Sequence, residues 1–162
     1  AARIVAVADV FDRVRQRRET TREGTTGAAA TVRALRTVLD QVRAGLLDAN
    51  VFKALVTVVP AYAPGAIVEL NDGRVCVVTR WNPSLPCSPT VRPLLPADPK
   101  SGEHALDEPV DLSRNPSLSV RSVDGEDVSA ENFHPMFKGE FDLRLLSGGI
   151  TLDSPVSESE AA

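Results

Sequence analysis

The run Arg3-Ile4-Val5-Ala6-Val7-Ala8-Asp9-Val10-Phe11-Asp12 places two carboxylates in an otherwise apolar stretch. Its apolar side chains recur at helical spacing, which predicts a helix over about residues 3–18 with most of its faces buried. A buried carboxylate without a partner is costly, so Asp9 would need a cation, a cluster of donors or a metal. Alternatively, Asp9 and Asp12 lie on a solvent-exposed face and pair with Arg13 or Arg15. The spacing alone leaves both interpretations open.

Two further helices are predicted before the pattern changes. Gly45 is a stop signal for the second helix, and Asp48 is an N-cap for the third, which ends before Pro60. The apolar face of the second helix, starting at Ala28, consists of Val32, Leu35, Leu39, Val42 and Leu46. That of the third consists of Val51, Leu55 and Val58.

Strands are predicted to follow the helices. Residues 66–70 and 74–81 are rich in β-branched side chains and are separated by Asn71-Asp72-Gly73, a strong hairpin signal. Shorter candidates lie at about residues 90–95, 110–112 and 118–123. About five short strands with tight turns predict a small, partly open barrel or a curled sheet. The fold class is therefore α+β, with helices first and a barrel-like, β-rich module after them.

Three motifs carry a resemblance to a known family. The segment ARIVAVADVFD, residues 2–12, resembles the helix that closes the catalytic core of HD-GYP proteins, the bacterial cyclic di-GMP phosphodiesterases of the HD phosphohydrolase superfamily. The segment AGLLD, residues 44–48, resembles that family's G-x-FDP turn. PGAIVEL and GRVCVV, residues 64–70 and 73–78, resemble the β-rich tail that many of these proteins carry. The resemblance covers roughly residues 1–123.

The resemblance implies roles for two residues. In the family, the first Asp of this helix is the last protein ligand of a metal centre of the iron or manganese type, and Asp9 is the matching position. The metal activates the water that attacks a cyclic dinucleotide. Where the family has Arg-Pro-Tyr-Arg, only Arg18 is retained, so Arg18 is a weak candidate for contacting substrate phosphate.

The same resemblance limits what this chain is expected to do alone. The family's His-Asp dyad, further metal-binding histidines and GYP loop would precede Ala1, and His104 and His134 form no ligand-like pair. We therefore expect no hydrolysis and no bound cofactor for the isolated chain. The alternative function is a degenerate, non-catalytic signalling module that binds a nucleotide or a protein, with Asp9 merely salt-bridged.

Missing helices would also leave the first helix uncovered. We expect Val5, Val7 and Phe11 to form an apolar patch along it in the isolated chain, because three helices are too few to bury them.

The chain divides into four expected parts. Residues 1–60 would be the C-terminal helices of an HD-GYP-like domain, and residues 61–123 a small β-rich module. Residues 124–150 are a docking segment of open role, and residues 151–162 an acidic, disordered tail. A cytoplasmic location is expected, because no apolar run is long enough to span a membrane.

The net charge of −4 at pH 7 hides a basic N-terminal part and an acidic C-terminal part. Under the alternative function, the partner of the chain would be a nucleotide or a protein. Nucleic acid is not favoured, because no aromatic side chains lie between the N-terminal arginines to stack on bases.

Overall fold

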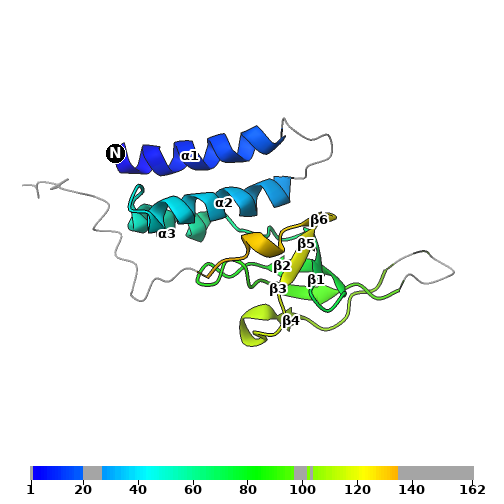
Figure 1. Cartoon of the computed structure of the whole chain (residues 1–162). Helices are drawn as coiled ribbons and strands as arrows, with labels where there is room; N and C mark the ends of the chain where they lie inside the picture. Colours follow the sequence, from blue (N-terminus) through cyan, green and yellow to red (C-terminus); the bar gives the residue numbers. More distant parts are fainter. Residues whose placement is uncertain (1, 20–26, 97–101, 103, 135–162) are drawn as a thin grey trace, which may run out of the picture.

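A computed structural model describes residues 2–19, 27–96, 102 and 104–134 of the chain (Figure 1). Three helices come first: α1 (Ala2–Glu19), α2 (Gly27–Arg43) and α3 (Ala49–Val58). Figure 1 shows α1 running beside α2, with α2 between α1 and the strands. One side of α1 therefore packs on α2, and no described element covers the opposite side.

The strands form one antiparallel sheet in the order β4-β3-β2-β1-β5-β6. Their bounds are β1 (Ile67–Leu70), β2 (Val75–Arg80), β3 (Thr90–Pro93), β4 (Val110–Asp111), β5 (Val120–Val123) and β6 (Glu126–Asp127). Two short 3-10 helices, η1 (Leu112–Arg114) and η2 (Ser129–Glu131), follow β4 and β6. The predicted α+β class and the order of helices before strands are confirmed. The expected barrel is not formed by the described strands, because β4 and β6 remain as separate edges of an open sheet.

Residues that tolerate a positive φ explain two hairpins of the sheet, β1–β2 and β5–β6. Asn71-Asp72-Gly73 joins β1 to β2 as predicted. Gly73 has a φ of 87°, a backbone conformation that is strained for residues with a side chain. Sequence reasoning missed the second hairpin, which joins β5 to β6 through Asp124 and Gly125 at φ values of 48° and 84°. An Asp-Gly pair is a strong signal for this tight turn, and the two-residue length of β6 is what hid it.

The structure confirms the predicted end of α2 and the predicted N-cap of α3. It contradicts the predicted burial of two side chains, Leu46 and Val58. Gly45, at a φ of 74°, ends α2, and Asp48 caps α3 by accepting hydrogen bonds from the N–H groups of Asn50 and Val51. Because α2 ends at Arg43, Leu46 falls in the turn and is 72% exposed rather than on the buried face. Val58 is likewise 70% exposed, since the buried face of α3 is formed by Val51, Phe52 and Val56.

A single apolar core joins the helices to the sheet. Tyr62 and Phe52 are its largest fully buried side chains, and it extends from Val7 of α1 to Val123 of β5. Phe133, in the predicted docking segment, is also buried and lies 6.2 Å from Phe52, ring centroid to ring centroid. The four-part division of the chain stays a prediction, and most of residues 124–150 and all of 151–162 lie outside the described residues.

Arg33 of α2 forms the main polar link between the two layers. Its guanidinium donates to Glu126 at 2.6 Å, to Glu131 at 3.2 Å and to the carbonyl oxygen of Asp127 at 2.8 Å. Burial alone would lower the pKa of Arg33, but the two carboxylates outweigh it and raise the pKa. The segment that carries β6 and η2 is thereby tied to the middle of α2.

Candidate functional site

Asp9 lies on the exposed side of α1. It forms an ion pair with Arg13, one helical turn further along, and more than half of each side chain is accessible to solvent. Asp12 is in a similar position, accepting a hydrogen bond from Gln16 at 2.6 Å. Of the two interpretations of this segment, the structure shows the exposed, salt-bridged one.

The apolar patch predicted on α1 is present in part. Val5 is 64% exposed and Ile4 is 47% exposed, and Ala8 beside them is also open to solvent. The expectation is wrong for Val7, which is 1% exposed because it faces the core alongside α2. Phe11 is half-buried, with the Arg15 guanidinium 6.0 Å from its ring centroid. Asp9 therefore shares the open side of α1 with exposed aliphatic side chains.

Arg18 is too far along α1 to sit beside Asp9. The two residues are nine positions apart in one continuous helix, or roughly 14 Å at the rise of an α-helix. The Arg18 side chain lies outside the described residues, so its suggested phosphate contact stays a prediction.

Within the described ranges, no group of three or more His, Cys, Asp or Glu side chains could hold a metal ion. His104 is exposed, and its Nδ1 lies 2.8 Å from the carbonyl oxygen of Leu95. His134 is also exposed. If Asp9 ligates a metal, its fellow ligands must come from outside the described residues.

The buried thiols offer no nucleophile. Cys76 and Cys87 are both free and buried. Burial raises the pKa of Cys87 to about 12, although the backbone N–H of Phe133 donates to its sulfur. A thiol with such a pKa stays protonated near neutral pH, and only the thiolate is strongly nucleophilic.

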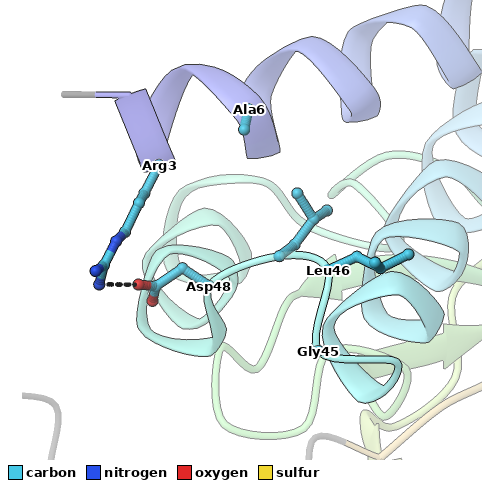
Figure 2. Close-up of a pocket in the computed structure, with 6 residues that line it drawn as sticks. Arg3, Ala6, Gly45, Leu46 and Asp48 are labelled. Atoms are coloured by element: carbon cyan, nitrogen blue, oxygen red, sulfur yellow. Dashed lines mark hydrogen bonds and ion pairs between the residues drawn. The ribbon is translucent and has the colours of Figure 1, made fainter.

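An open pocket of about 270 Å³ lies between the start of α1 and the α2–α3 turn (Figure 2). Arg3 donates to a carboxylate oxygen of Asp48 at 3.1 Å across its rim. Burial alone would raise the pKa of Asp48, but hydrogen bonds from the N–H groups of Val51 and Asn50, and then Arg3, lower it. The sequence identified Asp48 only as a cap, because nothing local indicates a partner 45 residues away.

A comparison with protein families finds a match over the strands. The model described as "KOW domain associated with HD domain" matches residues 67–131, from the first residue of β1 to the last residue of η2. This part of the chain is therefore similar to a KOW module of HD-domain-associated proteins. No curated protein and no solved structure matches the chain. Within the described residues, no helix is both long and apolar enough to cross a membrane.

Proposed function

We propose that the chain is the C-terminal portion of a metal-dependent phosphohydrolase resembling the HD-GYP cyclic di-GMP phosphodiesterases, and that Asp9 is one ligand of its metal. The observation that carries this proposal is the position of Asp9 on the uncovered side of α1, among Ile4, Val5 and Ala8. Aliphatic side chains around a carboxylate are what a helix presents when another helical surface with a cation is to cover it. The HD-associated family match further along the chain supports the same parentage.

The ion pair between Asp9 and Arg13 does not prevent this role. Exposed pairs of this kind contribute at most about 1 kcal/mol, so a divalent cation would displace Arg13 at little cost. Carboxylate oxygens suit hard cations such as manganese, and such a metal would lower the pKa of a bound water. Asp9 alone cannot hold the metal, so the remaining ligands would come from the rest of the parent protein.

The proposal is tested by hydrolysis of cyclic di-GMP by the full-length gene product with manganese or iron, with bound metal measured in parallel. Asp9→Asn is expected to lower both turnover and bound metal at least about 10-fold, the scale seen when groups at metal sites are removed. Asp12→Asn is the matched control, because Asp12 lies on the same helix with a similarly exposed carboxylate. It should leave both quantities near the wild-type level.

Two results would contradict the proposal. One is an Asp9→Asn protein that keeps its metal and its turnover. The other is metal-dependent turnover by the 162-residue chain alone that Asp9→Asn abolishes, because the chain would then contain a complete site.

The second candidate function is a non-catalytic module that binds a nucleotide or a protein. The existing Asp9–Arg13 pair favours it, since Asp9 already has a counter-ion within its own helix. A full-length protein that binds cyclic di-GMP without hydrolysing it, and whose affinity is unchanged in Asp9→Asn, would support this candidate instead.

A further inference from the structure

The sheet carries a group of aliphatic side chains on the side that faces away from the helices. The three helices lie on one side of the sheet (Figure 1), and the sheet residues on that side belong to the shared core. On the other side, Ile67 pairs with Val77, and Val75 lies two residues before Val77 in the same strand. Leu94 donates its backbone N–H to the carbonyl oxygen of Val75, and an isolated bridge pairs Leu106 with Leu94. These five side chains therefore share one face, and we call them the outer patch.

The described residues leave the outer patch partly open to solvent. Val75 is 44% exposed, Ile67 is 39% exposed and Leu106 is 38% exposed. An antiparallel sheet with one solvated face usually has polar side chains on that face. β2 has Val75 and Val77 there instead. Contiguous exposed aliphatic side chains of this kind indicate a surface that another segment covers.

The chain itself contains a segment with the matching pattern. The structure describes the chain as far as His134, and residues 135–162 follow. Within them, charged and apolar side chains alternate strictly through Glu140-Phe141-Asp142-Leu143-Arg144-Leu145. This alternation is typical of an extended segment with one apolar face. Glycines bound the run, with Gly139 before it and Gly148-Gly149 shortly after it, as is usual for a strand.

This segment is close enough in the sequence to reach the outer patch. Phe133 is buried against Phe52, which fixes the chain just before His134. Phe141 follows His134 by seven residues, and an extended stretch of that length spans up to roughly 24 Å. Two packed β layers are only about 10 Å apart. The chain can therefore pass around the edge of the sheet and place Phe141 on its outer side.

The charges on the outer side of the sheet also favour this segment. Arg92 lies opposite Val77, and its guanidinium donates to two backbone carbonyl oxygens at 2.7 and 3.1 Å. Both acceptors are neutral, so the charge of Arg92 has no carboxylate partner among the described residues. Glu140 and Asp142 would bring two carboxylates to this side of the sheet.

We propose that residues 140–146 of the same chain cover the outer patch as an extended segment, with Phe141, Leu143 and Leu145 against the aliphatic side chains of the sheet. Alternate side chains of an extended segment form one straight row, which suits the flat face of a sheet better than the helical stripe around Val5 on α1. The contact removes apolar surface of both partners from water. The inference does not rest on the proposed function.

The test is the alkylation rate of a thiol placed on the outer patch of the 162-residue chain. Val75→Cys introduces this thiol, and the natural thiols contribute little because both are buried. Adding Leu143→Glu should accelerate alkylation at least about 10-fold, because a charged side chain cannot stay on the aliphatic patch and the thiol becomes exposed. Arg144→Glu is the matched control. Its side chain belongs to the polar set of the alternation, so alkylation should stay slow.

Val5→Cys places the same probe on the exposed aliphatic side chains of α1. Its thiol should react quickly, and Leu143→Glu should leave that rate unchanged. Circular dichroism of each variant checks that the helices remain folded.

Four results would overturn the proposal. One is a Val75→Cys thiol whose alkylation is unaffected by Leu143→Glu. Another is equal acceleration by Leu143→Glu and Arg144→Glu, since the alternation would then have no role. Acceleration at Val5→Cys instead would place the segment on α1. Finally, protection of the Val75→Cys thiol that is lost on dilution from millimolar to micromolar concentration would mean that a second copy covers the outer patch.

Discussion

Arg33 is a charged side chain whose contacts are structural. Only 14% of its side chain is exposed, and it contacts two carboxylates and a backbone carbonyl 93 to 98 residues away. A charge removed from water is tolerated only when such partners surround it, and removing one partner leaves the others unpaired. Arg33 should therefore matter far more to stability than a typical surface arginine.

Replacing Arg33 by Met keeps the aliphatic stem and removes the charge. We expect the free energy of unfolding to fall by about 2 kcal/mol or more, because Glu126 and Glu131 would lose their shared cation. Arg121→Met is the matched control: Arg121 pairs with Glu69 at 3.5 Å, with 59% of its side chain exposed. Its loss should be about 0.5 kcal/mol or less. Urea titration measures both, and equal losses would refute the structural role assigned to Arg33.

At the scale of the element, α3 depends on Asp48 at its start. α3 has only ten residues, too few to be stable without a cap and tertiary packing. The Asp48 carboxylate accepts two backbone N–H groups and the Arg3 guanidinium, and these contacts hold its pKa below the usual range. A depressed carboxylate pKa means that the folded state prefers the charged form, so the contribution is present above the unfolded pKa and is lost as the pH falls through the folded one.

The Asp48→Asn variant isolates the charge, because asparagine still accepts hydrogen bonds at an N-cap. The wild type should be more stable by roughly 0.5–1 kcal/mol near neutral pH, and this advantage should disappear as the pH falls below about 4. Thermal unfolding at a series of pH values provides the measurement. Asp40→Asn is a control at an exposed carboxylate within α2. An advantage that persists undiminished at acid pH would show that the charge of Asp48 is not its source.

The elements also show which features the sequence could predict. Gly45, Asp48 and Asn71-Asp72-Gly73 act through their own backbone conformation or that of their immediate neighbours, and the structure confirms each one. Leu46 and Val58 were misplaced because the exposure of a helical residue depends on where its helix ends and what packs on it. The sheet was likewise predicted strand by strand, but its open edges depend on how distant strands meet.

In the candidate site too, contacts between neighbouring residues could be predicted, and contacts between distant residues could not. The motif around Asp9 pointed to α1, and the local pairing of Asp9 with Arg13 follows from their four-residue spacing. The pairs Arg3–Asp48 and Arg33–Glu126 were missed because their partners are 45 and 93 residues apart. No local pattern encodes such contacts.

At the scale of the whole molecule, the helices and the sheet share one apolar core. Buried residues run without a break from Val7 in α1, through Phe52 in α3, to Val68 and Val120 in the sheet. Neither layer could bury its apolar face without the other. The prediction of helical and β-rich parts at residues 1–60 and 61–123 thus describes their composition, and their independence is a separate question.

We expect the two layers to unfold together. Helix content at 222 nm reports on α1–α3, whereas the fluorescence of Trp81, which follows β2 and is the only tryptophan, reports on the sheet. In urea, both signals should follow one transition with the same midpoint, as in small cooperative domains. Phe133→Ala should shift both midpoints equally, because the buried Phe133 ring packs against Phe52 in the core that the helices and the sheet share. Two separate midpoints, or a shift of the helix signal alone, would show that the layers are independent domains joined only by proximity.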